Sequence, residues 1–232
     1  MKWENSIVTD FKWGSEIKNK AEKELVAAKI AAYVKNGQTI GVGSGSTVYV
    51  SLKHIAAKVK EEQLDIKVIP TSFEIELVCA SLGLKITTLK QDKPDWYFDG
   101  ADEVDPQNNL IKGRGGAMFR EKLMLVSSKE NYIIVDKTKL VDRLGTNFPV
   151  PVEITPDAIN YLRNCLKSMQ ATHIELRMAQ QKDGPVITEN GNFILDVRFQ
   201  EIKNTYEKDI KSMTGVIESG LFQGYPVTII QP

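Results

Sequence analysis

The stretch Thr39-Ile-Gly-Val-Gly-Ser-Gly-Ser-Thr47 decides the fold of this chain. It opens with a short apolar run, residues 39–42, that is typical of a buried strand. A glycine- and serine-rich turn follows, and a helical pattern then runs from Thr47 to about Lys60. A strand that passes through a tight turn into a helix is the repeating unit of parallel α/β sheets.

The same alternation continues along the chain. Apolar residues recur at spacings of three and four over about 15–33, which predicts a helix that ends at Asn36-Gly37. Further strands are predicted at 65–70, 96–98 and 132–135, and further helices at 73–82 and 116–128. We therefore expect a mostly parallel sheet with helices on both faces, with ligands at the carboxyl ends of its strands. We interpret residues 1–15 as an extension docked by Trp3, Phe11 and Trp13.

The pattern changes near Gly145. Phe148-Pro-Val-Pro151 is not expected to be a central strand throughout, because two prolines remove ladder donors. Thr155-Pro156 predicts a helix start with a hydroxyl cap. The remaining expectations are strands at 173–177, 193–199 and 216–217, a turn at 189–192, a helix at 203–213 and a closing strand at 227–230.

These elements predict two domains. Residues 1–145 with 221–232 would form the larger α/β domain, and residues 146–220 a small α+β domain. The closing strand at 227–230 would return to the sheet of the larger domain.

Composition excludes several classes of protein. The 232 residues are 42% hydrophobic, and 30 Lys and Arg balance 30 Asp and Glu. A nucleic-acid binder would be more basic, so any anion site must be local. Cys79 and Cys165 lie in apolar helical patterns and suit reduced thiols. Without an apolar run of membrane-span length or a signal core, we expect a cytoplasmic protein.

Residues 41–47 form the first segment that carries chemistry. Its glycines let the backbone approach an anion, and the helix start supplies free N–H groups. Ser44, Ser46 and Thr47 add hydroxyls. Ser46 stands where a dinucleotide fingerprint needs its third glycine, and no Gly-Lys-Ser/Thr closes a P-loop. The segment suits one phosphate, and the alternative is a tight turn without a ligand.

The second segment is Asp99-Gly-Ala-Asp-Glu-Val-Asp105, with four acids after an apolar strand. Carboxylates at a strand end are typical of proton-transfer sites. The same acids could bind a divalent metal, but the spacing differs from that of an EF-hand. Both histidines, His54 and His173, are far away in sequence. A solvated acidic turn is the remaining alternative.

The third segment is Lys112-Gly-Arg-Gly-Gly-Ala117, which leads into a helix that carries Glu121. Backbone amides in such a loop can stabilise a developing oxyanion. Glu121 either faces the same cleft or is an ordinary surface glutamate paired with a lysine. Together, a phosphate loop, an acidic strand end and an oxyanion loop favour enediolate chemistry by proton transfer over a metal-assisted hydride shift.

The three segments resemble those of the ribose-5-phosphate isomerase A family, and the resemblance covers about residues 20–232. The matching stretches are Gly43–Thr47, Phe98–Asp105, Ile111–Ala117 with Arg120–Lys122, Tyr132–Lys137 with Lys139, Phe148–Glu153, Thr188–Asn192 and Gly220–Phe222. The resemblance implies a doubly wound Rossmann-like domain with a small ferredoxin-like α+β domain. It also implies a cofactor-free aldose–ketose isomerase that interconverts D-ribose 5-phosphate and D-ribulose 5-phosphate, without a metal and as a homodimer or homotetramer.

Residue roles follow from the same resemblance. Glu121 would be the general base, Asp99 would assist ring opening, and Asp102 and Lys112 would orient hydroxyls and steady the enediolate. The implied substrate-binding residues are Ser44, Gly45, Ser46, Thr47, Gly100, Ala101, Gly113, Arg114, Gly115, Lys139 and Lys23. Arg114 departs from the family, which usually has glycine there, and a positive φ at Arg114 would be costly.

Two rival classes remain at this stage. A sugar-phosphate sensor on a related fold would keep the phosphate loop but need no base. A CoA-transferase or sugar-phosphate deaminase relative would need a nucleophilic glutamate in another context, or a catalytic histidine near the acidic segment. The joint presence of Asp99, Lys112 and Glu121 favours the isomerase.

Overall fold

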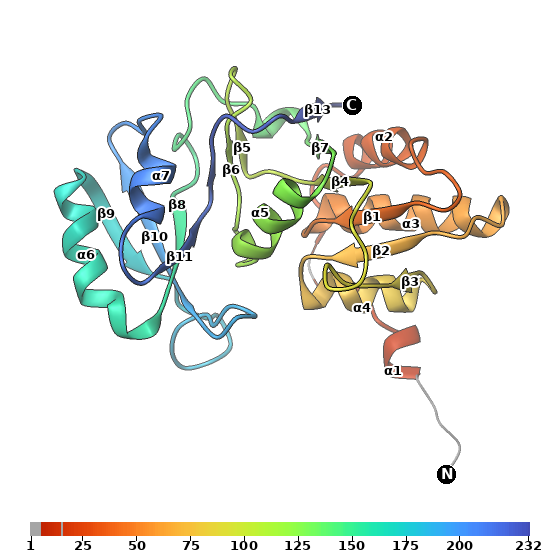
Figure 1. Cartoon of the computed structure of the whole chain (residues 1–232), viewed down its shortest axis with the longest axis horizontal. Helices are drawn as coiled ribbons and strands as arrows, with labels where there is room; N and C mark the ends of the chain where they lie inside the picture. Colours follow the sequence, from red (N-terminus) through yellow and green to blue (C-terminus); the bar gives the residue numbers. More distant parts are fainter. Residues whose placement is uncertain (1–5, 15) are drawn as a thin grey trace, which may run out of the picture. The chain divides into compact units, whose positions relative to one another are not determined.

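The computed structural model describes residues 6–14 and 16–232, which form two compact units (Figure 1). Unit 1 takes in the described residues of Met1–Gly100, Leu123–Lys137 and Pro226–Pro232. Unit 2 takes in Ala101–Lys122 and Thr138–Tyr225. The predicted small domain, 146–220, falls inside unit 2, and its boundaries stay a prediction.

Unit 1 is built on a six-stranded parallel sheet. Its strands run in the order β13-β7-β4-β1-β2-β3. They are β1 (Thr39–Val42), β2 (Lys67–Pro70), β3 (Lys85–Ile86), β4 (Trp96–Asp99), β7 (Glu130–Ile134) and β13 (Thr228–Ile230). This is the strand order of a doubly wound Rossmann-like sheet. The expected closing strand does return, as β13, and pairs with β7.

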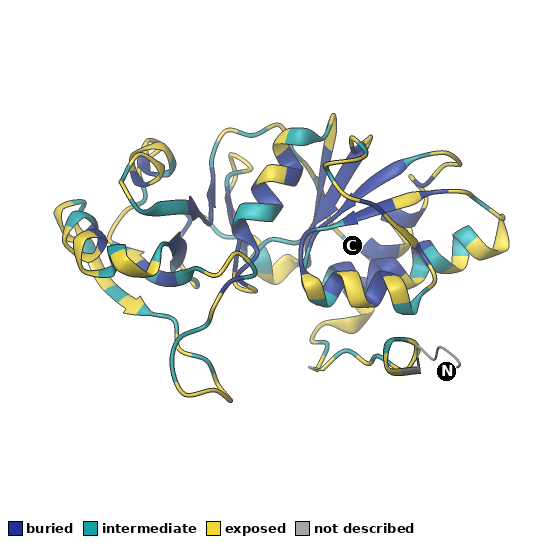
Figure 2. Cartoon of the chain, turned by 60° about the horizontal axis from the view of Figure 1, so that its bottom comes forward, coloured by how far each residue is buried: buried dark blue, intermediate teal, exposed yellow. Residues whose placement is uncertain are grey.

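Helices cover both faces of this sheet. Ile40 and Val42 of β1 belong to one core cluster with residues of α2, α3 and α4, whereas a Cβ on Gly41 would meet Met124 of α5. Neighbouring residues of a strand face opposite sides, so α5 packs on the other face. The helices of this part are α1 (Ser6–Thr9), α2 (Lys20–Ala31), α3 (Ser46–Glu61) and α4 (Phe73–Ser81), together with the residues of α5 (Met118–Ser127) from Leu123 onward. Figure 2 shows the buried strands between half-exposed helices.

The N-terminal segment packs on unit 1 as expected for two of its three aromatic residues. Trp13 stacks on Tyr49 with ring centroids 5.0 Å apart, and Phe11 also packs against the core. Trp3 lies outside the described residues.

Unit 2 contains a four-stranded antiparallel sheet in the order β11-β8-β10-β9. Two helices connect its strands in a β-α-β-β-α-β sequence, so the predicted ferredoxin-like arrangement is confirmed. Its elements are β8 (Val150–Ile154), η2 (Pro156–Ala158), α6 (Ile159–Ser168), β9 (Ala171–Leu176), β10 (Phe193–Phe199), α7 (Tyr206–Lys211) and β11 (Val216–Ser219). Unit 2 has its own hydrophobic core.

A third, small sheet in unit 2 was not predicted. It pairs β12 (Leu221–Phe222) with β6 (Leu110–Ile111), and β6 with β5 (Glu103–Val104). Strands of two residues show no periodicity, so the sequence gives no signal for them. A short helix, η1 (Lys137–Lys139), follows β7.

The expectation that residues 148–151 do not form a central strand throughout is confirmed. β8 begins at Val150, after the first proline, but Pro151 lies inside this interior strand. The Pro151 carbonyl accepts from Gly220 N at 2.7 Å, while the Gly220 carbonyl accepts from Lys112 N at 2.9 Å. The Gly220 carbonyl, which would face an N–H at position 151, therefore has another donor, and the N–H that proline lacks is not needed there.

The helix start at Thr155-Pro156 is confirmed, but its cap is not. Pro156 opens η2, which leads into α6, and the Thr155 hydroxyl makes no capping hydrogen bond. The fixed φ of proline is enough to start this turn.

Candidate active site

The loop between β1 and α3 in unit 1 contains two glycines that the backbone requires. A Cβ on Gly43 would lie 1.9 Å from Cγ of Asp99, so only glycine fits there. Gly45 has φ 96° and ψ 177°, a conformation that is essentially restricted to glycine. The loop thus brings its backbone directly against the acid at the end of the neighbouring strand β4.

Asp99 is fully buried and held by three donors from unit 1. Its Oδ1 accepts from Ser44 N at 3.0 Å and from Gly100 N at 2.7 Å, and its Oδ2 accepts from the Tyr97 phenol. A solvated acidic turn is therefore the wrong description of Asp99. Tyr97 was not among the predicted site residues, although its position two residues before Asp99 on the same strand puts both side chains on one face.

Hydroxyl groups and a lysine surround the start of α3. Lys23 of α2 is buried and donates from Nζ to Ser46 Oγ at 2.8 Å. Ser44 Oγ lies 3.0 Å from Thr71 Oγ1, and the Thr47 carbonyl accepts from Ser51. The start of a long helix, with free amides, hydroxyls and a cation beside it, is suited to bind an anion.

Two of the four acids in the second segment support the fold. Glu103 is fully buried and accepts from the amides of Gly145, Asn147 and Phe148. Asp105 closes the turn before β6 by accepting from the amides of residues 107 and 109. The carboxylates left for chemistry are therefore Asp99 and Asp102.

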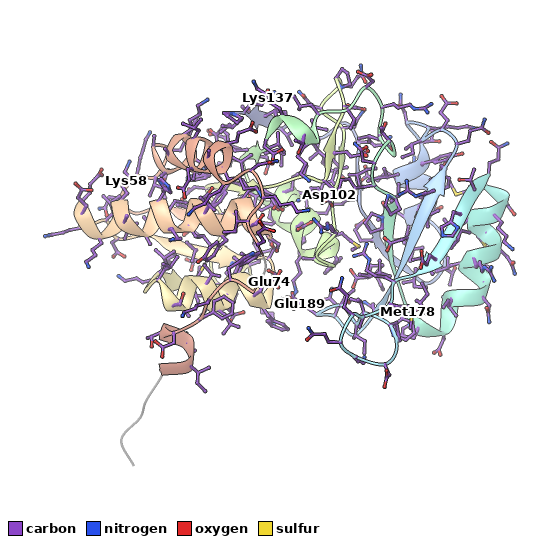
Figure 3. The ribbon with its side chains drawn as sticks, turned by 180° about the vertical axis from the view of Figure 1, so that it is seen from behind. Lys58, Glu74, Asp102, Lys137, Met178 and Glu189 are labelled. Atoms are coloured by element: carbon purple, nitrogen blue, oxygen red, sulfur yellow. The ribbon has the colours of Figure 1, made fainter. Side chains whose placement is uncertain are left out.

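Asp102 of unit 2 is half-buried, and its Oδ2 accepts from Arg114 N at 3.1 Å. Figure 3 labels this residue. Burial raises the pKa of Asp102 above its ordinary value of 3.8. The charges of Lys112 and Lys139 and the Arg114 amide act in the opposite direction and only partly offset that rise.

Lys112 and Glu121 form a buried ion pair in unit 2. Lys112 Nζ lies 3.4 Å from Glu121 Oε2, and the two side chains are 3% and 5% exposed. Glu121 lies in the first turn of α5, and Lys112 directly follows β6. The alternative of an ordinary surface glutamate is therefore wrong. A buried carboxylate beside a buried ammonium suits proton transfer to a carbon acid and stabilisation of the resulting anion.

The loop between Lys112 and α5 has a backbone set by two glycines. Gly113 and Gly116 have φ 96° and 88°. Arg114, between them, has no positive φ and is exposed. Its replacement of the family's usual glycine therefore strains no backbone.

The structure brings the predicted residues together in two sets. Within unit 1, Ser44 and Gly100 contact Asp99, and Lys23 contacts Ser46. Gly45 is the N-cap of α3, and Thr47 lies in its first turn. Within unit 2, Lys112 pairs with Glu121. Lys112, Arg114 and Lys139 act on Asp102 by lowering its pKa against the larger effect of burial. The Gly100–Ala101 peptide bond passes from one unit to the other.

The described part of the chain comprises residues 6–14 and 16–232. Over that range, no group of three or more His, Cys, Asp and Glu side chains is arranged to hold a metal ion. None of the helices in the same range combines the length and apolar character needed to cross a membrane.

A Rossmann-like unit with a helix start suited to an anion, and a second unit with a ferredoxin-like sheet and a buried acid–lysine pair, define a class of α/β protein suited to acid–base chemistry. The profile described as Ribose 5-phosphate isomerase A (phosphoriboisomerase A) matches residues 67–231. Proteins named Ribose-5-phosphate isomerase A are 45% identical in Trichormus variabilis, over 86% of each chain, and 39% identical in Methanothermobacter thermautotrophicus, over 90% of this chain and 92% of the relative.

Solved structures agree with these relatives. Ribose 5-phosphate isomerase A from Methanocaldococcus jannaschii superposes with a TM-score of 0.87 at 37% identity, covering 90% of this chain and 93% of the other. A D-ribose-5-phosphate isomerase in complex with phospho-erythronic acid gives 0.88 at 37% identity, over 92% and 95%. This chain belongs to the ribose 5-phosphate isomerase A family.

Proposed function

We propose that this chain is an aldose–ketose isomerase that interconverts D-ribose 5-phosphate and D-ribulose 5-phosphate by proton transfer through an enediolate. The observation that carries the proposal is the buried pair of Glu121 and Lys112, 3.4 Å apart. Membership of the family supports it, and so does the loop in unit 1 in which Ser44 N donates to Asp99.

Glu121 is the general base. Its carboxylate removes the proton from C2 of the open-chain aldose, and the electron pair of that bond forms the enediolate as the C1 carbonyl becomes an oxyanion. The same carboxylic acid then returns the proton to C1, while the hydroxyl proton moves from O2 to O1 and C2 becomes the carbonyl. Lys112 stabilises the negative charge at close range.

The remaining predicted residues divide by chemistry. Asp99 moves a proton between O1 and the ring oxygen to open the sugar, and Asp102 orients hydroxyls. The amides of Gly113, Arg114 and Gly115 complete the oxyanion site. Ser44, Gly45, Ser46, Thr47, Lys23 and Lys139 bind substrate and its phosphate, and Gly100 and Ala101 line it.

The proposal is tested with D-ribose 5-phosphate, purified enzyme treated with EDTA, and the variant Glu121→Gln. We expect turnover by the wild type and a loss of at least about a thousandfold in the variant, since general acid–base groups contribute up to roughly 10⁴-fold. The exposed Glu76 of α4 supplies the control Glu76→Gln. Near-normal turnover in Glu121→Gln would remove Glu121 from this role.

Solvent isotope tracing distinguishes the two isomerase mechanisms. In D2O, proton transfer through an enediolate introduces deuterium at the reacting carbon of the product, whereas an intramolecular hydride shift does not. A wild type that binds D-ribose 5-phosphate without turnover would instead support a sugar-phosphate sensor.

We also propose that the enzyme acts in the cytoplasm as a homodimer or homotetramer. The support is the family resemblance and the reduced state expected for Cys79 and Cys165. Light scattering of the purified chain measures its mass against the 26.0 kDa of one copy. A mass of one copy would reject the oligomer.

A further inference from the structure

Arg177 makes contacts that the proposed mechanism has not used. It directly follows β9 and forms a two-pronged ion pair with Asp196 of β10, with Nε–Oδ2 at 2.8 Å and Nη2–Oδ1 at 2.5 Å. Both side chains are less than one-fifth exposed. The pair fixes the plane of the guanidinium and leaves Nη1 to donate elsewhere.

The Nη1 group donates to two successive carbonyls of the loop before α5. It lies 3.0 Å from the Gly113 oxygen and 2.9 Å from the Arg114 oxygen. In a planar trans peptide, the C=O and the next residue's N–H point in opposite directions. Arg177 therefore turns the amides of Arg114 and Gly115 away from itself.

The direction of one of these amides is visible in the structure. Arg114 N donates to Asp102 Oδ2, on the side of the loop opposite the guanidinium. The next amide, of Gly115, makes no hydrogen bond to any residue in the described part of the chain. A preorganised amide of this kind, next in the chain to the amide that bonds Asp102, suits a substrate oxyanion.

We infer that Arg177, held by Asp196, is a positioning residue that aims the amide of Gly115 at the oxyanion formed during catalysis, while the amide of Arg114 stays bonded to Asp102. This inference rests on the proposed isomerase function. Arg177 acts through the loop and does not itself need to touch substrate. Because Asp196 balances its charge, its effect is one of geometry.

The test compares Arg177→Lys and Arg177→Met with the control Arg198→Met. Arg198 is an exposed arginine of β10 that donates to the Asn147 carbonyl, away from this loop. We expect kcat to fall by roughly tenfold to a hundredfold in both Arg177 variants, with KM changed by less than about threefold, because loss of a whole oxyanion donor costs about 10²–10³-fold. Arg198→Met should match the wild type. Unchanged kcat in the Arg177 variants would overturn the inference.

Ligand binding supplies a readout that does not depend on turnover. Phospho-erythronic acid, the ligand in a related structure, carries a carboxylate, whereas ribitol 5-phosphate has only hydroxyls at that end. Arg177→Lys should weaken the binding of phospho-erythronic acid by about tenfold or more, as measured by titration calorimetry. It should leave the binding of ribitol 5-phosphate unchanged. Equal weakening of both ligands would overturn the inference, since it would indicate a purely structural role.

Two safeguards keep the test decisive. Asp196→Asn replaces the Arg177 variants if they do not fold, and urea unfolding checks each protein. If the wild type does not isomerise D-ribose 5-phosphate, the proposed function fails by itself. The two-ligand comparison then still decides whether Arg177 orients the loop.

Discussion

The glycine-containing loops that precede α3 and α5 are held in different ways. The first, at residues 43–45, is held within its own parallel sheet, where Asp99 of the adjacent strand accepts from Ser44 N. The loop at residues 113–116 is held by Arg177, which lies 63 positions away from Arg114. In the first, strand adjacency supplies the support. In the second, the support comes from the side chain of a residue far away in sequence, which must be held in one orientation.

A substitution in the first loop is expected to have the larger effect on the stability of the protein. In Gly43→Ala the added Cβ would lie 1.9 Å from Asp99 Cγ, and a buried, triply bonded acid cannot move aside cheaply. We expect a loss of about 3 kcal/mol or more in the free energy of unfolding, at the upper end for overpacking. Urea unfolding measures it.

Gly100→Ala is the matched control for stability. A Cβ there would meet only the Ile134 carbonyl at 3.9 Å, an ordinary contact, although it adjoins the same acid. Its unfolding free energy should stay within about 0.5 kcal/mol of the wild type. Equal losses in the two variants would mean that contact with Asp99 does not explain the need for Gly43.

The contrast between the loops also explains how far the sequence could predict this protein. Periodicity predicts the strands and helices of unit 1 except the two-residue β3 and the four-residue α1, and Asp99 follows from its place at a strand end. The part played by Arg177 has no local signal, because its partners are at 113, 114 and 196. The third sheet was not predicted because its strands have two residues each. Pro151 is tolerated inside β8 because the Gly220 carbonyl accepts from Lys112 N.

Asp102, beside the second loop, tests the electrostatic side of the comparison. Its pKa is raised in the folded protein, so its negative charge opposes folding. Below the ordinary value of 3.8 the carboxyl is protonated in both states, and no penalty exists. The penalty grows as the pH rises through the folded pKa. Asp102→Asn should therefore raise the free energy of unfolding at pH 7 and leave it unchanged near pH 3, as measured by urea titrations at both values.

Asp92 provides a control with the opposite sign. Thr87 and Lys67 lower the pKa of Asp92 below 3.8, so its charge favours folding above that value, and this contribution is lost as the pH falls through the folded pKa. Asp92→Asn should destabilise the protein at pH 7. If Asp102→Asn also destabilises it there, Asp102 is not a carboxylate that burial disfavours.

The smallest expected effect is that of Lys23→Met. This variant tests whether the two loops have different functions. It is buried and donates to Ser46 Oγ at 2.8 Å, so Lys23→Met keeps the apolar stem and removes the cation next to the start of α3. If the first loop binds phosphate, KM for D-ribose 5-phosphate should rise by roughly tenfold, the value of one charged hydrogen bond, with kcat within about twofold. Lys29→Met, at an exposed position of the same helix, should leave both constants unchanged. A variant of Lys23 that loses kcat at constant KM would mean that the first loop, like the second, acts on the transition state, and the division of binding and chemistry between them would be wrong.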